Sequence, residues 1–259
     1  MFVQTRGFPL HVEVDGPAAA PVLMLSNSLC TDLRMWDDQI PTWSKTYRVV
    51  RYDRRGHGQS GVPSGPYTVD EFGHDALAIM DSLGIKRVNW CGLSMGGMVG
   101  QWLGAYAPDR IDALIMSNTH SYYADKSVWD ERMALAQNKG MAHAAAAAMS
   151  RWFTPEAMSQ RPDKVSLIEN MFETTDLGGY LACCAAIRNM DMRPAHSRIT
   201  APTLVIVGLR DPATPPAAGE AVQKAIQGAQ LATIDASHLS NIGQPKVYAD
   251  LVLDFLKNS

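Results

Sequence analysis

The sequence predicts an α/β fold, in which a mostly parallel central sheet is flanked by helices on both faces and interrupted by one helical insertion. In the first 119 residues, short and nearly all-apolar runs alternate with stretches of helical periodicity. Strands of that composition are typical of parallel sheets, which helices bury on both faces. The alternation stops between residues 120 and 198 and then resumes, which indicates an insertion within one domain.

The individual elements follow from the hydrophobic pattern and from the residues that interrupt it. Each expected strand is a short apolar run bounded by residues that favour turns. The first long helix stops at Gly84, and a second helix follows the glycines after residue 91. The expected strands cover residues 22–26, 47–52, 88–91, 111–116, 202–208 and 230–234, and the expected helices cover residues 69–83, a stretch ending near 106, and 245–256.

Residues 120–198 are expected to form a helical lid over a core made of residues 1–119 and 199–259. The lid segment contains a run of alanines at 144–148 and several Met and Trp residues at helical spacing. Its basic and acidic residues are equal in number, so it carries no overall charge bias. No internal repeat or low-complexity linker was found, which favours one domain with an insertion.

The composition excludes several classes of partner. Hydrophobic residues make up 46% of the chain and charged residues 19%, as in soluble globular proteins. The formal net charge of −3 and the lack of a dense Lys/Arg stripe argue against nucleic acid as a partner. The N-terminus lacks a signal-peptide pattern, and no stretch reaches the roughly 18 apolar residues of a membrane span, so no membrane contact is expected. The sequence is compatible with a monomer or a homo-oligomer.

The four cysteines fit reduced thiols better than a disulfide framework, so a cytoplasmic protein is expected. The adjacent residues Cys183 and Cys184 have two interpretations. They could form a redox device, but a pair of small apolar residues in a helix is the favoured interpretation.

The strongest local signal is a G-x-S-x-G pattern at residues 92–96, directly after an apolar strand and directly before a helix. This is the context of a nucleophile elbow, a tight turn whose neighbouring positions must be small and whose serine is exposed at the carboxyl end of the sheet. The helix that follows points its positive N-terminal end toward the same place. Ser94 is therefore the candidate nucleophile, and a glycine-rich turn without a catalytic role is the alternative.

A serine hydroxyl is a weak nucleophile and needs an adjacent base. Of the seven histidines, His238 is favoured because it follows the last strand and should lie at the carboxyl end of the sheet. His120, at the end of a central strand, is the rival candidate. His57 belongs to a tight turn and is interpreted as structural.

The base in turn requires a carboxylate that fixes the tautomer and orientation of its ring. Asp211 follows the strand at residues 202–208, which gives the chain order Ser, Asp, His that accompanies a nucleophile elbow. Asp235 is nearer to His238 in sequence but is interpreted as a turn residue. No acidic residue follows the strand that ends near Met116, which removes the main alternative position.

An oxyanion hole is expected from the backbone N–H groups of Met95, after the nucleophile, and Leu29, in the loop after the strand ending at Ser26. The sequence contains no H-E-x-x-H, no paired C-x-x-C and no P-loop, and residues 92–97 do not spell G-x-G-x-x-G. We therefore expect no metal ion and no organic cofactor.

Over nearly its whole length, the chain resembles the 3-oxoadipate enol-lactonases, which have the α/β-hydrolase fold. The motifs around the three catalytic candidates are shared with many esterases, whereas the lid motifs are more specific because lids vary between activities. One difference from the wider fold is Asn27-Ser28, where most relatives have His-Gly, although the backbone amides remain available. The matching motifs lie at residues 26–29, 92–97, 102–103, 151–155, 179–187, 211–216 and 238–241.

The resemblance implies a serine hydrolase of aromatic compound catabolism, in the β-ketoadipate pathway, that opens a five-membered enol lactone with an acetate arm. That arm is an anion, and in an apolar pocket it needs a cation or several donors. Arg132 is the candidate because it should share a helix face with Trp129, and its fork matches a carboxylate. A surface ion pair is the alternative for Arg132, and Arg151 and Arg188 are the reserves. Trp129 and Trp152 are candidates to line the pocket, with packing as their alternative.

Two other functions stay open from the sequence alone. Within the hydrolases, the chain could be a carboxylesterase or a C–C bond hydrolase of ring-cleavage products. From a different class, it could be a ligand-binding receptor on a hydrolase fold. Such receptors often lose part of the triad, and here all three members are in place.

Overall fold

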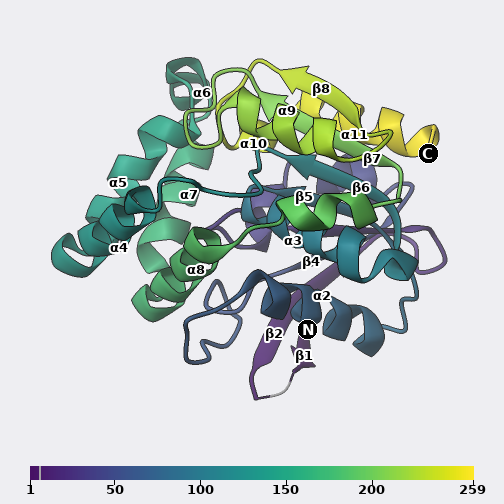
Figure 1. Ribbon diagram of the computed structural model, residues 1–259, viewed down its shortest axis with the longest axis horizontal. Coiled ribbons are helices and arrows are strands. Elements are labelled where there is room, and N and C mark those ends of the chain that lie inside the picture. The colour runs from purple at the N-terminus through teal and green to yellow at the C-terminus, as the bar shows by residue number, and fades with distance from the viewer. Residues whose placement is uncertain (6) are drawn as a thin grey trace.

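The computed structural model describes residues 1–5 and 7–259, and it contains one eight-stranded sheet with helices on both faces (Figure 1). The strands are β1 (Phe2–Gln4), β2 (Pro9–Asp15), β3 (Val22–Ser26), β4 (Arg48–Tyr52), β5 (Val88–Leu93), β6 (Ile111–Ser117), β7 (Thr203–Gly208) and β8 (Gln230–Ile234). Their order across the sheet is β1-β2-β4-β3-β5-β6-β7-β8. Strands β3 to β8 pair in parallel, and β1 and β2 form an antiparallel edge. The predicted fold class is confirmed.

The strand order reverses between β3 and β5, which are neighbours in the sheet. In an open α/β sheet, the connections after two such strands leave toward opposite faces and open a crevice at the carboxyl ends. The two loops that border this crevice are those that follow Ser26, at the end of β3, and Leu93, at the end of β5. The topology therefore brings the expected oxyanion loop beside the expected nucleophile.

Two helical layers cover the sheet. On one face, α2 (Val69–Ser82) packs against α3 (Met95–Tyr106), α3 packs on β5 and β6, and α9 (Pro216–Ala225) packs on β7. On the other face, α11 (Pro245–Lys257) contacts β8 and α1 (Ile40–Trp43). Helix α2 begins at a capping box, in which Thr68 and Glu71 satisfy each other's backbone N–H groups. Such a cap contributes about 1 kcal/mol to helix stability.

The strand ranges predicted for residues 22–26 and 230–234 agree with β3 and β8, and the other expected strands and helices agree within two residues at each end. Strand β5 continues to Leu93 and ends directly at Ser94, one residue before α3. A single residue, Ser94, therefore connects the strand to the helix, whereas a strand that ended at residue 91 would have left a longer turn.

The segment between β6 and β7 contains five α-helices that lie together at one end of the molecule, in teal to green in Figure 1. Its two connections to the core meet at an isolated antiparallel bridge between Tyr122 and Asp191. Ion pairs from Arg161 to Asp38 and from Arg210 to Glu156 join the insertion to the core along its length. The helices are α4 (Ser127–Lys139), α5 (Met141–Trp152), α6 (Pro155–Gln160), α7 (Pro162–Thr174) and α8 (Leu177–Asn189).

An aromatic cluster anchors one face of the sheet beneath α11. The rings of Trp36, Trp43 and Tyr248 lie with centroids 6.1 to 6.4 Å apart and are fully buried. The Tyr248 hydroxyl is not left without a partner, since it lies 2.6 Å from Ser117 Oγ at the carboxyl end of β6. The cluster therefore fixes the end of the strand that supports the expected nucleophile.

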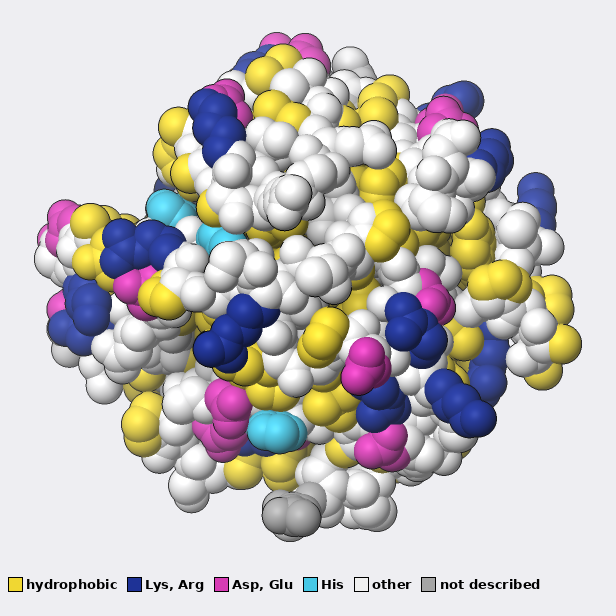
Figure 2. All heavy atoms as spheres, turned by 45° about the vertical axis from the view of Figure 1, so that its right-hand side comes forward, with side chains coloured by type: hydrophobic (Ala, Val, Ile, Leu, Met, Phe, Trp, Pro, Cys, Tyr) yellow, Lys and Arg dark blue, Asp and Glu magenta, His cyan; other side chains and the backbone are white. Residues whose placement is uncertain are grey.

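Basic and acidic side chains are interspersed on the face shown in Figure 2, without a large field of one sign. Within the described residues, none of the helices is both long and apolar enough to span a bilayer.

Candidate active site

Ser94 occupies a backbone conformation that few residues other than glycine adopt. Its φ is 56° and its ψ is −112°, between the end of β5 and the first turn of α3. A strained backbone conformation of this kind persists only where surrounding interactions hold the residue in place. Such residues are concentrated at functional sites. Here the Ser94 N–H donates to Ser117 O at 2.8 Å, and the Thr119 hydroxyl donates to Ser94 O at 2.8 Å. The turn is thus clamped on both sides by β6 and the loop after it.

The glycines of the motif are required by close backbone approach. A Cβ at position 92 would overlap the carbonyl of Gly96, and a Cβ at position 96 would overlap the carbonyl of Ser26. The second contact is with the end of β3, so Gly96 allows α3 to approach the neighbouring strand. Ser94 is 7% exposed, so the residue is buried.

His238 and Asp211 are brought together from two different loops. The Nδ1 atom of His238 lies 2.8 Å from Asp211 Oδ2, and both residues are buried. Because Nδ1–H donates to the carboxylate, the neutral ring carries its lone pair on Nε2, as a general base requires. Asp235, the alternative acid, instead pairs with Arg210 at the surface, at 2.8 Å.

Asp211 is surrounded by donors other than His238. Its carboxylate accepts from Asn118 Nδ2 at 2.9 Å, from Thr214 Oγ1 at 2.6 Å and from the backbone N–H groups of Ala213 and Thr214. Burial alone would raise the pKa of Asp211, but the charge of His238 and the hydrogen bonds from His238, Thr214 and Asn118 outweigh it and lower the pKa. The carboxylate is therefore held ionised.

Asn118 and Thr214 are functional residues that the sequence reasoning missed. Asn118 follows β6, at the position where an acidic residue was found to be absent, and it connects the elbow to the acid. Its neighbour Thr119 holds Ser94, while Asn118 itself holds Asp211 and accepts from Ser240 Oγ at 2.6 Å. The signal that could have found Asn118 was its position at the carboxyl end of a central strand.

His57 and His120 have structural partners. The backbone N–H of Cys30 donates to His57 Nε2 at 2.9 Å, and burial lowers the pKa of His57 to about 3, so the ring is neutral. The Nδ1 atom of His120 accepts from the N–H groups of Ser121 and Tyr122, at 3.0 and 3.3 Å. His120, the rival base, is therefore engaged with its own loop.

The expected oxyanion donors are both available. Met95 is the first residue of α3, where a backbone N–H has no partner within the helix. The N–H of Leu29 has no hydrogen-bond acceptor in the part of the chain that the structure describes. Loop residues on either side of Leu29 are fixed, since Trp36 Nε1 donates to Asn27 Oδ1 at 2.9 Å and Thr31 Oγ1 donates to Ser28 O at 2.9 Å.

A small cavity lies between the insertion and the oxyanion loop. Its volume is about 30 Å³, close to the space that one water molecule needs. Apolar and aromatic side chains dominate its wall, and only two charged groups reach it, those of Arg132 and Arg151. The lining residues are Leu29, Arg132, Leu135, Ala144, Ala148, Arg151, Trp152, Phe172 and Tyr180.

Neither cavity arginine forms an ion pair within residues 1–5 and 7–259. Burial, and then the positive charge of Arg132, lower the pKa of Arg151, and Arg151 Nε has no hydrogen-bond partner in the described chain. Two cations sharing an apolar pocket without a carboxylate create a site that an anion would stabilise. The reserve candidate Arg188 is different, since it pairs with Asp130 at 2.6 Å on the surface.

Trp129 and Trp152 occupy different positions. The guanidinium carbon of Arg132 lies 4.5 Å from the centroid of the Trp129 ring, so this indole supports the arginine from beside the cavity and does not line it. Trp152 does line the cavity, and its ring centroid is 6.1 Å from that of His238. The backbone carbonyls of Arg151 and Trp152 accept from Ser237 Oγ and Leu239 N, so the insertion is bonded to both neighbours of His238.

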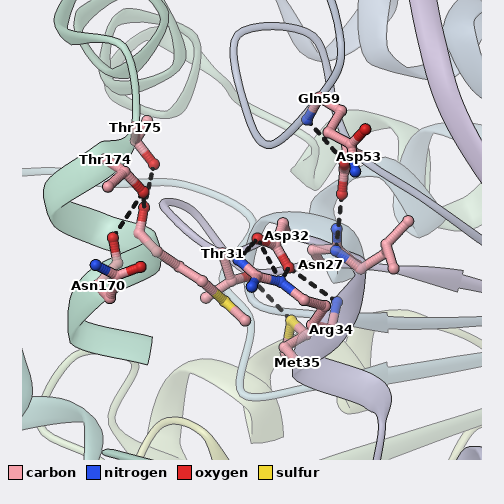
Figure 3. Close-up of polar contacts among 12 residues, drawn as sticks. Asn27, Thr31, Asp32, Arg34, Met35, Asp53, Gln59, Asn170, Thr174 and Thr175 are labelled. Carbon is pink, nitrogen blue, oxygen red and sulfur yellow. Dashed lines mark hydrogen bonds and ion pairs between the residues drawn. The ribbon is translucent and has the colours of Figure 1, made fainter. Parts of the chain in front are cut away.

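A larger hollow, of about 350 Å³, lies on the other side of the oxyanion loop, and neither its lining nor that of the small cavity includes Ser94 or His238. Figure 3 shows its polar wall, where Asp32 faces Arg34 and Asp53 accepts from the N–H of Gln59. Asp53 also lies 2.9 Å from His11 Nδ1. Because both carboxylates are paired, this hollow is not the candidate active site.

Among the described residues, no group of three His, Cys, Asp or Glu side chains could hold a metal ion. A G-x-G-x-x-G spacing does occur, at residues 56–61, but α2 begins only at Val69, so it lacks the helix that a dinucleotide site requires.

The cysteines are free and buried, and Cys183 and Cys184 lie within α8 as small apolar residues. Burial raises the pKa of Cys91 and of Cys183 to about 12. At pH 8 only about one such thiol in ten thousand is ionised, and the thiolate is the reactive form. We expect iodoacetamide at pH 8 to leave the native protein unmodified and to label four thiols after denaturation in guanidinium chloride. Mass spectrometry checks this, and stoichiometric labelling of the native protein would contradict it.

The comparisons with known proteins bear on the fold and the family of the whole chain. Residues 21–245 match the alpha/beta hydrolase fold family. The 3-oxoadipate enol-lactonase 2 of Acinetobacter baylyi is 38% identical over 96% of this chain and 93% of its own length, and enol-lactonase 1 of that organism is 36% identical over 100% and 97%. The crystal structure of the enol-lactonase from Burkholderia xenovorans is 42% identical and superposes with a TM-score of 0.97, covering 99% of this chain and 100% of that one. The similarity therefore includes the insertion as well as the core.

Proposed function

Because the chain belongs to the α/β hydrolase fold family and, within it, to the 3-oxoadipate enol-lactonases, we propose that it opens 3-oxoadipate enol-lactone to 3-oxoadipate through a serine acyl-enzyme. It is thus a carboxylic ester hydrolase of the β-ketoadipate pathway. The observation that carries the choice of an anionic lactone is the cavity with two unpaired arginines beside Leu29 and Trp152. A neutral ester would leave both cations without a partner.

In this proposal, Ser94 is the nucleophile, His238 the general base and Asp211 the acid that orients the base. The contact of His238 Nδ1 with Asp211 supports the last two roles, and the strained turn supports the first. The N–H groups of Leu29 and Met95 form the oxyanion hole. Residues 120–198 are the lid over this site, and residues 1–119 and 199–259 are the core.

Acylation begins when Ser94 Oγ attacks the lactone carbonyl and His238 Nε2 takes the hydroxyl proton. The carbonyl oxygen becomes an oxyanion, which accepts from the two backbone N–H groups. As the tetrahedral intermediate collapses, the ring C–O bond breaks and the ring oxygen leaves as an enolate, a better leaving group than an alkoxide. The enolate oxygen takes the proton held by His238, which returns the ring to its neutral form, and the resulting enol becomes a ketone, which makes ring closure unfavourable.

Deacylation uses the same groups in reverse. A water molecule gives a proton to His238 and attacks the acyl carbon, and the second oxyanion occupies the same two donors. Ser94 leaves with the proton from His238. The products are 3-oxoadipate and free enzyme, so one water is consumed in each turnover.

Arg132 and Arg151 bind the carboxylate of the acetate arm. Each guanidinium can offer two parallel N–H donors to a carboxylate, and charge-assisted hydrogen bonds of this kind are about twice as strong as neutral ones. Trp129 holds Arg132 by a cation–π contact, which limits the freedom that binding would otherwise remove.

All four cysteines are free thiols, a state that a reducing compartment preserves, and we place the enzyme in the cytoplasm on that ground.

The proposal is tested by following the loss of the lactone's ultraviolet absorbance with purified protein, beside hydrolysis of 4-nitrophenyl acetate. We expect Arg132→Ala and Arg151→Ala each to raise KM for the lactone about 10- to 100-fold, since a hydrogen bond to a charged group contributes about 1.5–3 kcal/mol. For the neutral ester, KM should change less than about threefold, since no carboxylate is present.

Arg188→Ala is the matched control, because Arg188 lies in the same insertion and is paired with Asp130. It should leave both KM values near those of the wild type. Equal effects of Arg132→Ala and Arg151→Ala on lactone and ester would remove the carboxylate role, and failure of the wild type to turn over the lactone would refute the proposed substrate.

A further inference from the structure

The oxyanion loop rests on a buried arginine that the mechanism above does not use. Arg54 is 2% exposed, and its guanidinium contacts three atoms of the segment just before Leu29. Nη2 donates to Asn27 O at 2.8 Å and to Ser26 Oγ at 3.4 Å, and Nη1 donates to Ser28 O at 3.4 Å. These contacts are with the last residue of β3 and with the loop after it, which supplies one oxyanion donor in the proposed function.

The charge of Arg54 has no carboxylate partner. Within the described chain Arg54 forms no ion pair, and its Nε has no hydrogen-bond acceptor. The adjacent Arg55 shows the usual arrangement, because it binds Asp75 at 2.7 Å and Glu71 at 2.6 Å. A buried cation is costly unless its donors are satisfied, and Arg54 is satisfied chiefly by backbone carbonyls of the oxyanion loop.

One of those carbonyls belongs to the same peptide group as the expected oxyanion donor. The carbonyl of Ser28 and the N–H of Leu29 are the two ends of one planar peptide unit. Hydrogen bonds to the carbonyl end polarise the unit and strengthen its N–H as a donor, since hydrogen bonds in a chain reinforce one another. Ser28 O accepts from both Arg54 Nη1 and Thr31 Oγ1, whereas Leu29 N–H has no acceptor within the described chain.

We propose that Arg54 is a positioning residue of the oxyanion hole, which orients and polarises the Ser28–Leu29 peptide with the help of Thr31. Figure 3 shows Asn27, Thr31 and Met35 gathered at this loop, and Thr31 Oγ1 also lies 3.0 Å from Met35 Sδ. The Cys30 N–H, which donates to His57, fixes the next peptide in the loop. The peptide is thus held from its carbonyl side, and its N–H, which has no acceptor within the described chain, can donate to an oxyanion.

A thionoester separates this role from general support of the fold. Sulfur in place of the carbonyl oxygen is larger and a poorer hydrogen-bond acceptor, so a thionoester gains little from an oxyanion hole. The probes are 4-nitrophenyl acetate and its thiono analogue. The measured quantity is kcat/KM for the oxygen ester divided by kcat/KM for the thionoester. We expect Arg54→Lys to lower this ratio about tenfold and Thr31→Val to lower it about threefold, mainly through kcat of the oxygen ester.

Arg55→Lys is the matched control, because Arg55 is also a buried arginine in the same turn, and its partners are carboxylates. It should reduce the melting temperature without changing the ratio. Thr31→Val keeps the test decisive if Arg54→Lys does not fold, since it removes a donor to the same carbonyl without disturbing a buried charge. An unchanged ratio in a folded Thr31→Val or Arg54→Lys protein overturns the proposal, as does an equal fall in Arg55→Lys.

The inference rests on the proposed serine mechanism, and the same assay distinguishes the two. Hydrolysis of 4-nitrophenyl acetate by the wild type that is lost in Ser94→Ala supports the mechanism independently of Arg54. Hydrolysis that survives in Ser94→Ala overturns the mechanism and this inference with it. Loss in Ser94→Ala together with an unchanged thiono ratio in the loop variants overturns this inference alone.

Discussion

Replacing Ser94 by Ala is expected to lower kcat for lactone opening about 10⁵- to 10⁶-fold, because it removes the hydroxyl that forms the acyl-enzyme. The substitution removes one oxygen atom and leaves the clamps on the backbone of residue 94 intact, which are the bonds to Ser117 and Thr119. Alanine adopts a positive φ about as unwillingly as serine, so the melting temperature should change little. The measurement is single-turnover loss of lactone absorbance with enzyme in excess.

A fluorophosphonate probe provides an independent test of the same residue. It should label the wild type at Ser94 and fail to label the Ser94→Ala protein. The control is Ser82→Ala, at an exposed serine that ends α2, which should keep full activity and labelling. Retention of more than about one-hundredth of wild-type activity by Ser94→Ala would show that another group attacks the lactone.

The main features of the fold could be predicted from the sequence because they depend on hydrophobic pattern. The runs at residues 22–26 and 230–234 are bounded by turn residues, and both agree with the observed strands. The predicted place of His238 follows from the same reasoning, because the carboxyl ends of parallel strands share one edge of the sheet. In contrast, no bounds were predicted for β1, β2 or α9: β2 carries His11 and Glu13 among its apolar residues, and α9 follows two prolines with few large apolar side chains.

The contacts within the site depend on where each side chain points, and the pattern of residue types in the sequence does not give that information. Arg54 and Arg55 are adjacent and identical in type, yet one binds backbone carbonyls of the oxyanion loop and the other binds Asp75 and Glu71. Only the packed structure assigns each side chain its direction. Asn118 was missed for a related reason, because reasoning from charge searched for an acid after β6, whereas the structure uses an amide there to hold the acid of another loop.

Replacing Asp211 by Asn is expected to lower kcat about 10⁴-fold while leaving KM for the lactone within a few-fold. The carboxylate accepts from His238, Asn118, Thr214 and Ala213, and each of these groups is a donor. An amide in its place turns one acceptor into a donor. The Nδ1 atom of His238 then has to accept, its proton moves to Nε2, and the ring can no longer take the proton of Ser94.

Stability should change with a defined pH dependence. The pKa of Asp211 is lower in the folded protein than in the unfolded chain, so its ionised form stabilises the fold above the unfolded value of about 4. That contribution is lost as the pH falls below about 4 through the folded pKa. The Asn variant lacks this titration. The difference in unfolding free energy between the wild type and the variant should therefore be largest near pH 7 and should decrease in that acid range. Urea denaturation of both proteins at several pH values measures it.

Asp235→Asn is the control that decides between Asp211 and Asp235 as the acid that orients His238. Asp235 is the closer in the chain, but it is exposed and paired with Arg210, so the substitution should change kcat less than about threefold. If Asp235→Asn instead abolished turnover while Asp211→Asn did not, the contact between His238 and Asp211 would have no catalytic meaning. Asp235 would then be the acid that orients His238, although five hydrogen-bond donors converge on Asp211.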